Sequence, residues 1–382
     1  MNLHGKGVNP IISAILVLVI SITGIGLVLE VGMPAIEKGR EMAVFDGAVR
    51  DLGSLESIIE NVKLGGEGTS RTLSLEVRDG MYNVNDTHNT ITFAHEMENG
   101  FLPSALCRSK GNIITKTFGD GRAMDMRFQE GMGNETMDCS RYENHGKIHG
   151  ANWTDTVYGT ALNFDGLDDE VQVPDDDSLD QNESFTISAW VNWQGNVGDV
   201  HEEASYIFGA YHNYGLAVFE ENDEIYLSGG YVSGFEILSV DSNSSLDTER
   251  WYHVAFVYDD EGDALRLYID GERDNKEEHT DGPDTDDHNK SIGYVPDTIK
   301  EDYGAWKGYI NDVRLYSHAL SDEDIQRLSR RGSPGTSDEV EVKLIPAGVD
   351  IKSSLTMGSG SHSLLIRNVG HGEKAQVKIE QL

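Results

Sequence analysis

Positive charge and cysteine are both scarce in this 382-residue sequence. It has 30 lysines and arginines against 66 aspartates and glutamates, which gives a formal net charge of -36. This negative excess repels the phosphates of nucleic acids and of anionic lipids, so nucleic acid is excluded as a partner. The two cysteines, Cys107 and Cys139, are too few for a disulfide framework, although a single bridge is permitted outside the cell. Their pairing is left open.

Several catalytic motifs are also missing. The 13 histidines show no paired metal-ligand spacing such as His-Glu-x-x-His, and there is no Gly-rich phosphate loop and no Ser-His-Asp order. A retaining glycoside hydrolase needs two carboxylates about 5 Å apart on one strand face. The one compact acidic cluster, residues 220–224, lacks the alternation of acidic and apolar residues that would place two carboxylates on one strand face, and it predicts a hairpin turn instead. We therefore expect no catalytic residues, and glycoside hydrolysis is the less favoured alternative.

Acidic residues are spread along the whole chain. This distribution is typical of proteins from salt-rich habitats, and also of acidic secreted proteins whose loops bind calcium. Asn-x-Ser/Thr sequons predict a glycosylated, exposed surface, and they begin at Asn85, Asn134, Asn152, Asn182, Asn243 and Asn289.

One long apolar run lies near the N-terminus. Residues 11–29 carry no charge and are rich in Ile, Val and Leu, and this is the length that a helix needs to cross a bilayer. The short head before the run holds Lys6 as its firm positive charge, and no ordinary secretory cleavage site follows the run. The sequence thus predicts a cytoplasmic leader over residues 1–7 and a single membrane span, with the bulk of the chain after Glu30 outside the cell.

Helical spacing of apolar residues continues beyond this span. It predicts an amphipathic stretch that ends at the glycines of residues 65–68. The apolar positions are Phe45, Ala48, Val49, Leu52, Leu55, Ile58, Ile59 and Val62. One long helix over residues 8–64 is therefore expected.

The sequence Lys6-Gly7-Val8-Asn9-Pro10 directly before the apolar run resembles the class III signal of archaeal type IV pilin-like proteins. The resemblance implies cleavage by a prepilin peptidase between Gly7 and Val8, and assembly of the first helix into a surface filament. This chain departs from the family at Ile12, where the family has glutamate. An uncleaved signal anchor is the alternative.

Strand-like segments flank a large central region. They are residues 72–77 and 90–96 before it, and residues 340–345, 363–368 and 375–380 after it. The simplest arrangement is one small pilin-like β domain built from residues 65–119 and 336–382, with a larger domain, residues 120–332, inserted between the halves. Two separate flanking domains are the alternative.

The central region has the pattern of short strands throughout. Apolar and polar residues alternate over residues 185–192 and 265–269, and an Asp270-Gly271 turn follows the second segment. Ser321 and Asp324 form a capping box for one short helix. Many short strands with regular turns predict a β-sandwich or jelly roll, so the fold class is mainly β after the N-terminal helix.

The order of segments in this region is similar to that of laminin-G-like, concanavalin A-like jelly-roll domains of the lectin and glucanase superfamily. The segments are RFQEGMGNETMDCSRYENHGKIHGANW, GTALNFDGLDDEVQVPDDDSLD, SFTISAWVNW, RWYHVAFVYD, LRLYIDGE and GYINDVRLYSHALSDEDIQRL. The resemblance implies that the inserted domain binds a carbohydrate or a cell surface and so mediates adhesion. A structural minor pilin without a ligand is the alternative.

The resemblance also implies a calcium ion at the rim of the jelly roll, held by carboxylate and amide oxygens. Asp138 and Asn144 in the first loop, and Asp165 and Asp168 around Gly166, are the positions that match the acidic loops of the family. Asp and Asn are also common turn formers, which is the alternative interpretation of these four residues.

A sugar needs an aromatic ring against the apolar face of its pyranose. The aromatic residues expected at strand ends or in loops are Trp193, Tyr206, Tyr211, Tyr214 and Trp306. Trp190 and Trp251 lie within predicted strands, so we interpret them as core residues.

Overall fold

The structure is a computed structural model, and it describes residues 39–40, 43–96, 108–110, 112–118, 121–157, 159–195, 204–209, 213–234, 236–279, 281–284, 288–294, 305–330, 339–372 and 374–382. The predicted span at residues 11–29, the cleavage site between Gly7 and Val8, and the side chains of Cys107 and Tyr211 lie outside the described residues. Within the described part, no helix is both long and apolar enough to cross a bilayer.

The chain divides into two compact units. The first unit contains residues 1–102, 110–114 and 342–382, and the second contains residues 103–109 and 115–341. The second unit therefore interrupts the first in sequence. The boundaries expected for the inserted domain, residues 120–332, fall inside the second unit.

In the first unit, residues 43–64 form a helix whose buried positions follow the apolar spacing of the sequence. The positions that are at most 2% exposed are Ala48, Leu52, Leu55, Ile59 and Val62. The helix ends where Gly66 and Gly68 adopt left-handed φ angles of 78° and 85°, which glycine reaches without a steric penalty.

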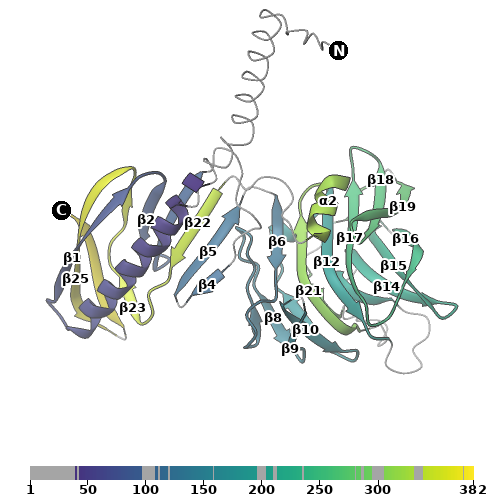
Figure 1. Cartoon of the computed structure of the whole chain (residues 1–382), viewed down its shortest axis with the longest axis horizontal. Helices are drawn as coiled ribbons and strands as arrows, with labels where there is room; N and C mark the ends of the chain where they lie inside the picture. The colour runs from purple at the N-terminus through teal and green to yellow at the C-terminus, as the bar shows by residue number, and fades with distance from the viewer. Residues whose placement is uncertain are drawn as a thin grey trace, which may run out of the picture. The chain divides into compact units, whose positions relative to one another are not determined.

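Strands from both flanks of the chain form two sheets, most of whose residues belong to the first unit (Figure 1). One sheet has the order β1 (Ser70–Val77), β25 (Gly360–His371), β26 (Ala375–Gln381) and β23 (Val349–Ile351). The other has the order β24 (Leu355–Met357), β2 (Met81–Asn85), β3 (Thr90–Glu96), β22 (Glu339–Leu344), β5 (Ile113–Phe118) and β4 (Arg108–Lys110). Because β1 pairs antiparallel with β25, the N-terminal and C-terminal flanks hydrogen-bond to each other.

Two sheets form a sandwich in the second unit. The first sandwich sheet has the order β19 (Glu272–Glu278), β18 (Ala264–Ile269), β17 (Trp251–Asp259), β12 (Phe185–Trp193), β21 (Lys307–Tyr316), β10 (Gly159–Asp165) and β9 (Asn152–Thr156), with β6 (Arg122–Met126) also on β21. The second sandwich sheet has the order β16 (Glu236–Leu246), β15 (Glu224–Ser233), β14 (Tyr214–Glu221), β13 (Ser205–Gly209), β20 (Lys290–Ile292), β11 (Glu170–Val173), β8 (Gly146–His149) and β7 (Glu135–Thr136).

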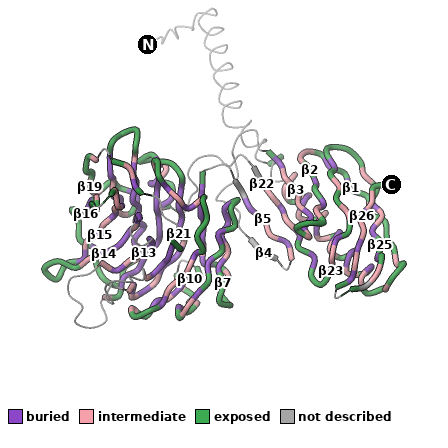
Figure 2. The backbone as a smooth tube through the Cα atoms, turned by 180° about the vertical axis from the view of Figure 1, so that it is seen from behind, coloured by how far each residue is buried: buried purple, intermediate pink, exposed green. Residues whose placement is uncertain are grey.

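The two sandwich sheets pack face to face around one apolar core. Ile187 and Phe256 from the first sheet and Leu216 and Leu227 from the second are fully buried in it. These residues come from the alternating apolar positions of their strands, as a period of two requires. Figure 2 shows buried residues concentrated in the strands and exposed residues at the loops.

Helix α2 (Asp322–Ser329) covers part of the outward side of the first sandwich sheet. Its Ile325 and Leu328 pack with Val257 and other buried residues of the strands. The hydroxyl of Ser321 accepts the N–H of Asp324 at 3.2 Å, which confirms Ser321 as the N-cap of the predicted capping box.

Two predicted turns are confirmed. Asp270 and Gly271, with φ angles of 52° and 86°, join β18 to β19. Asn222 and Asp223, with φ angles of 55° and 66°, join β14 to β15. Both central residues are left-handed in each turn, as the tight hairpin turns that fit strand twist require. The acidic cluster at residues 220–224 is therefore a hairpin turn.

A buried charge cluster lies where β6 meets β21. The carboxylate of Asp125, which is fully buried, forms ion pairs with Arg122, with Arg127 at 2.7 Å and with Arg314 at 3.4 Å. Burial alone would raise the pKa of Asp125, but the guanidinium groups of Arg127, Arg122 and Arg314 hold that pKa well below its usual range. The cluster therefore depends on a negative charge at its centre.

Candidate functional site

The first loop, residues 136–145, is organised by the buried carboxylate of Asp138. Its Oδ1 accepts the N–H groups of Asp125 at 2.7 Å and Ser140 at 2.9 Å. Its Oδ2 accepts the N–H of Asn144 at 2.8 Å and the hydroxyl of Ser140 at 2.5 Å. The side-chain amide of Asn144 donates to the carbonyl of Ala123 at 3.2 Å. Asp138 and Asn144 thus hold the first loop against β6.

Cys139 lies in the same loop and is disulfide-bonded. The only other cysteine in the sequence is Cys107. The backbone N–H of Cys139 also donates to the carbonyl of Asp125 at 2.8 Å. The loop is therefore fastened by covalent and hydrogen bonds together.

The acidic loop, residues 165–169, connects β10 to β11. Its Asp165 accepts the N–H of Leu167 at 2.8 Å, and its Asp169 accepts the N–H of Asp165 at 2.8 Å. Gly150 lies directly against Asp169, because a Cβ at Gly150 would come within 1.9 Å of Oδ1 of that carboxylate. Asp169 is only 4% exposed, whereas Asp165 and Asp168 are exposed.

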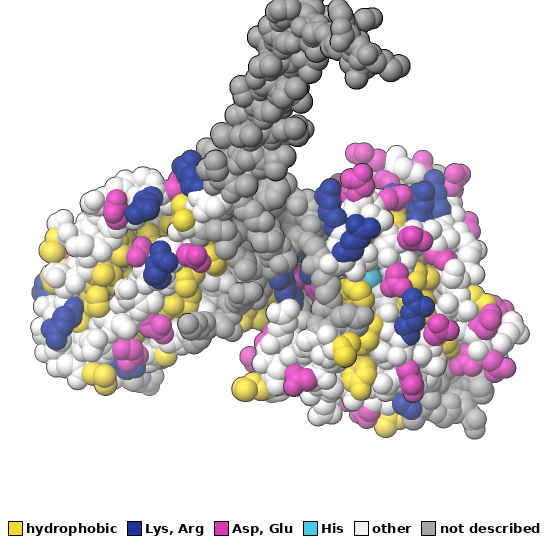
Figure 3. All heavy atoms as spheres, viewed as in Figure 1, with side chains coloured by type: hydrophobic (Ala, Val, Ile, Leu, Met, Phe, Trp, Pro, Cys, Tyr) yellow, Lys and Arg dark blue, Asp and Glu magenta, His cyan; other side chains and the backbone are white. Residues whose placement is uncertain are grey.

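The acidic loop has the donor set that a hard cation prefers. One carboxylate oxygen from each of Asp165, Asp168 and Asp169 lies within 4.8 Å of the other two, and no other such group of acidic, histidine or cysteine ligands occurs in the described ranges. Burial raises the pKa of Asp169, and the charges of Asp165 and Asp168 raise it further. A bound divalent cation would offset this repulsion, and backbone carbonyls and water could complete the six to eight oxygens of calcium. Figure 3 shows acidic side chains scattered over the drawn face.

The structure therefore groups two of the four expected metal ligands. Asp165 and Asp168 lie together, and Asp169 joins them. Asp138 is not a member of this group, because its oxygens accept hydrogen bonds within the first loop. Asp169 could have been nominated from the sequence run Asp168-Asp169, but its contact with Gly150 is visible only in the fold.

Three of the aromatic residues expected at strand ends or in loops do lie there, since Trp193 ends β12, Tyr214 begins β14 and Trp306 precedes β21. They are 3%, 2% and 0% exposed and belong to the core, so their rings do not line a surface site as expected. The rings of Trp193 and Trp306 meet edge to face with centroids 4.8 Å apart. The hydroxyl of Tyr214 donates to the carbonyl of Leu179 at 2.6 Å. Trp193 is six residues after Ile187 in β12, so the period of two puts both side chains on the core side of the sheet. This alternation is the sequence signal that would have placed Trp193 in the core.

Tyr206 is half-buried and lies on the outward side of the second sandwich sheet. Its ring covers two glycines, because a Cβ at Gly209 would lie 3.2 Å from Cδ1 of Tyr206 and a Cβ at Gly215 would lie 3.1 Å from Cε1. Gly209 is opposite Gly215, and Gly215 is opposite Gly230. The absence of side chains along this row lets the tyrosine ring lie close to the strands. We call this surface the tyrosine face.

The acidic loop leads directly into the tyrosine face. Glu170 follows Asp169 and begins β11, and its Oε2 accepts the hydroxyl of Ser291 at 3.0 Å. Ser291 is opposite Gly209 in the sheet. Carboxylates, a hydroxyl and an aromatic ring thus follow one another from the rim of the second sandwich sheet across β11, β20 and β13.

A second aromatic pair lies on the outward side of the first sandwich sheet. Trp251 and Tyr309 are half-buried and stack with centroids 6.1 Å apart and an interplanar angle of 21°. Both are opposite Asn192, which belongs to the strand between them. Trp190 is 9% exposed, in agreement with its interpretation as a buried residue, whereas the assignment of Trp251 to the core is wrong. Tyr309 was not nominated from the sequence.

Comparison with known proteins concerns the second unit. Residues 164–326 match the model of the concanavalin A-like lectin/glucanases superfamily known as Laminin_G_3. No curated protein matches the chain.

Solved structures with a similar fold include domain 4 of AbnA, a GH43 extracellular arabinanase from Geobacillus stearothermophilus, in complex with arabinotriose. It is 17% identical with a TM-score of 0.41, and the match covers 55% of this chain and 98% of that one. The binding domain of Paraclostridial Mosquitocidal Protein 1 is 13% identical with a TM-score of 0.45, and the botulinum neurotoxin serotype D binding domain is 19% identical with a TM-score of 0.42. Each of these two matches covers 56% of this chain and 52% of the toxin domain, so this chain spans about half their length. These likenesses concern the fold alone.

Proposed function

We propose that the second unit, a laminin-G-like, concanavalin A-like jelly roll, binds a glycan of a neighbouring surface with the help of calcium. The observation that carries the proposal is the continuity between the acidic loop and the tyrosine face. Asp169 of the acidic loop precedes Glu170, and Glu170 contacts Ser291 beside the glycines that support Tyr206. The family match over residues 164–326 includes all of these residues.

The chemistry of this surface suits a sugar. The ring of Tyr206 offers a flat apolar surface to the C–H groups of a pyranose, and the carboxylate of Glu170 can accept hydrogen bonds from its hydroxyl groups. Asp165, Asp168 and Asp169 would hold the calcium ion, which supplies a positive centre for hydroxyl oxygens beside the ring. A strongly acidic surface favours neutral glycans over anionic ones, because anions are repelled at a net charge of -36.

Binding can be tested on a glycan array with the full chain in a nonionic detergent, in the presence of calcium and of EDTA. We expect Tyr206→Ala to abolish binding to the glycans that the unmodified chain binds on the array. The matched control is Tyr309→Ala, which removes a half-buried tyrosine from the other sandwich sheet and should leave binding intact. Equal binding by Tyr206→Ala and the unmodified chain would contradict the assignment.

We also propose that the chain is displayed outside the cell by its N-terminal apolar segment. The sequons support an extracellular location: Asn134, Asn152, Asn182, Asn243 and Asn289 are exposed, and Asn85 is half-buried. Mass spectrometry of the native N-terminus tests the pilin-like alternative. A mature chain that starts at Val8, found in filaments, would support assembly, whereas a chain that begins at Met1 in the membrane fraction would identify an uncleaved anchor.

A further inference from the structure

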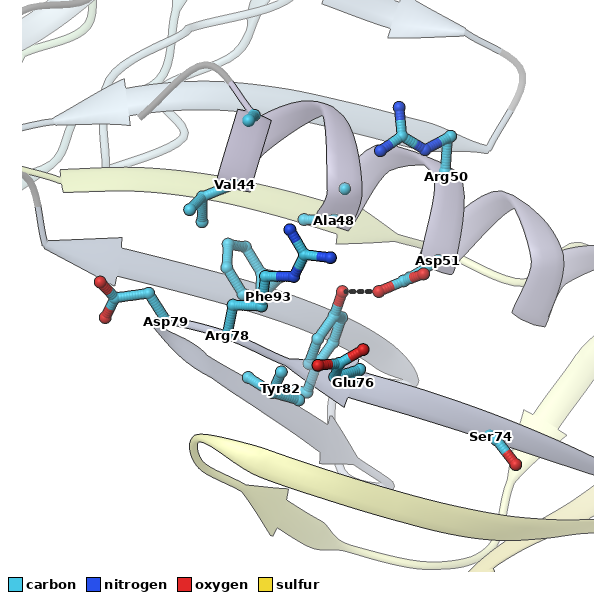
Figure 4. Close-up of a pocket in the computed structure, with 13 residues that line it drawn as sticks. Val44, Ala48, Arg50, Asp51, Ser74, Glu76, Arg78, Asp79, Tyr82 and Phe93 are labelled. Carbon is cyan, nitrogen blue, oxygen red and sulfur yellow. Dashed lines mark hydrogen bonds between the residues drawn. The ribbon is translucent and has the colours of Figure 1, made fainter. Parts of the chain in front are cut away.

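A cavity of about 320 Å³ opens in the first unit between the helix over residues 43–64 and strands β1, β2 and β3 (Figure 4). Its volume lies within the range of small-molecule sites. The lining residues that matter for its chemistry are Gly47, Asp51, Glu76, Arg78, Tyr82 and Phe93. The cavity is separate in sequence and in structure from the jelly roll, since all of its lining residues belong to the first unit.

Small residues on the helix keep this cavity open. Ala43, Gly47 and Ala48 line it, and a Cβ at Gly47 would meet no atom within 4 Å. Glycine in the interior of a helix is less favourable than alanine, because it loses more backbone freedom on folding. The helix therefore carries an unfavourable residue at the position where a side chain would fill the cavity.

The floor of the cavity is aromatic and fixed. The rings of Tyr82 and Phe93 lie with centroids 4.8 Å apart, and each residue is 2% exposed. The hydroxyl of Tyr82 donates to Oδ2 of Asp51 at 3.1 Å, which Figure 4 shows as a dashed line. This hydrogen bond joins the helix to β2 and holds both side chains in place.

Charges of both signs surround this floor. Glu76 and Arg78 are two residues apart at the end of β1, and neither forms an ion pair or side-chain hydrogen bond within the described part of the chain. In Figure 4 the side chain of Arg78 extends toward the helix, close to Phe93. By contrast, Asp79 is already paired with Arg40 at 3.2 Å.

We propose that this cavity binds a small zwitterion with an apolar body, such as a free apolar α-amino acid. The guanidinium of Arg78 would bind the carboxylate, since its fork of N–H donors matches a carboxylate. The ammonium group would bind Glu76, with Asp51 nearby, and the apolar body would lie on Tyr82 and Phe93. A simple anion would be repelled by the carboxylates of Glu76 and Asp51, and a simple cation would be repelled by Arg78, so both charges are required.

Isothermal titration of the full chain in a nonionic detergent with L-leucine and L-phenylalanine tests the proposal. Leucinamide lacks the carboxylate, and 4-methylpentanoic acid lacks the ammonium group. We expect each analogue to bind about tenfold more weakly than L-leucine, because each loses a charge-assisted contact. The proposal would be overturned if either analogue bound as tightly as L-leucine. It would also be overturned if neither L-leucine nor L-phenylalanine showed saturable binding at millimolar concentration.

Variants locate the site. Gly47→Leu should abolish binding without lowering the melting temperature, because its side chain fills the cavity and suits a helix better than glycine. Gly53→Ala is the matched helix control, since its Cβ would only contact Ile113 at 3.9 Å, and it should bind normally. Arg78→Gln should weaken binding of L-leucine about tenfold, but it should strengthen binding of leucinamide, because it removes the positive charge that repels this cation.

The corresponding control is Arg71→Gln on β1, which is exposed and does not line the cavity, and it should bind both ligands as the unmodified chain does. Normal binding of L-leucine by Gly47→Leu would contradict the proposed location. Loss of glycan binding by the second unit has no bearing on these titrations, so the two proposals can fail separately.

Discussion

The replacement Asp138→Asn separates a folding role of the first loop from a metal-binding role. An asparagine can keep one oxygen as acceptor for the N–H groups of Asp125 and Ser140. At the position of Oδ2, however, its NH₂ group faces the N–H of Asn144, which then has no acceptor. The hydrogen bonds from the N–H groups of Asp125 and Ser140 remain, but their acceptor is no longer charged.

The expected loss follows from these contacts. A hydrogen bond to a charged group contributes about 1 kcal/mol more than a neutral one, and an unpaired buried N–H costs about 1–3 kcal/mol. Asp138→Asn should therefore lower the free energy of unfolding of the second unit by about 3–5 kcal/mol. For a unit as large as the second one, this loss of free energy should lower the melting temperature by about 10 °C.

Urea unfolding followed by tryptophan fluorescence measures this loss. All five tryptophans of the sequence lie in the second unit, so the signal reports on that unit. Asp223→Asn is the control, because it removes one acid from an exposed turn where φ is 66° and asparagine is well tolerated. A loss below about 1 kcal/mol would refute the reasoning. A loss seen in calcium but absent in EDTA would instead identify Asp138 as a metal ligand.

Three further predictions follow from buried groups. Asp125→Asn should destabilise the second unit by about 3–5 kcal/mol, because three arginines lose their shared partner. The pKa of Asp125 is lower in the folded chain than in the unfolded chain, so the ionised carboxylate stabilises the fold above the unfolded pKa of about 3.9, and this stabilisation is lost as the pH falls below that value. A difference in unfolding free energy between Asp125→Asn and the unmodified chain that stays constant down to a pH of about 2 would contradict this role of Asp125. Because the pKa of Asp169 is raised, the affinity for calcium should fall as the pH is lowered through that pKa. Calorimetry in buffers of different ionisation enthalpy measures the protons that are released when calcium binds. An affinity that does not change with pH would argue against Asp169 as a ligand. Reduction of the disulfide of Cys139 should lower the unfolding free energy by about 3 kcal/mol in urea titrations, and unchanged stability would show that this bond does not constrain the unfolded chain.

Strand alternation predicted much of the sandwich. In β12 the residues at Phe185, Ile187, Ala189 and Val191 point into the core as the sequence pattern requires, and the same period places Trp193 there. Tyr206 could not be placed in this way. The register shifts between Tyr206 and Phe208, so that neighbouring residues Ile207 and Phe208 are both buried in the core. Such a bulge breaks the period of two, and the sequence carries no clear signal of it.

Contacts between distant segments were beyond the sequence. Asp169 fits beside Asp165 only because Gly150 leaves room for its carboxylate. Trp251 and Tyr309 stack because β17 and β21 both border β12, and this strand order cannot be derived from alternation. Residue types therefore indicated where acidic and aromatic groups are available, and the sheet topology determined which of them meet.

The calcium dependence of glycan binding tests the central claim most directly, because the claim joins the acidic loop and the tyrosine face into one site. The affinity for a glycan bound on the array would be measured for the full chain and for Asp168→Asn, each in calcium and in EDTA. We predict that EDTA weakens binding by the unmodified chain, and that Asp168→Asn binds weakly in both conditions. Strong binding that is unchanged by EDTA and by Asp168→Asn would contradict the account.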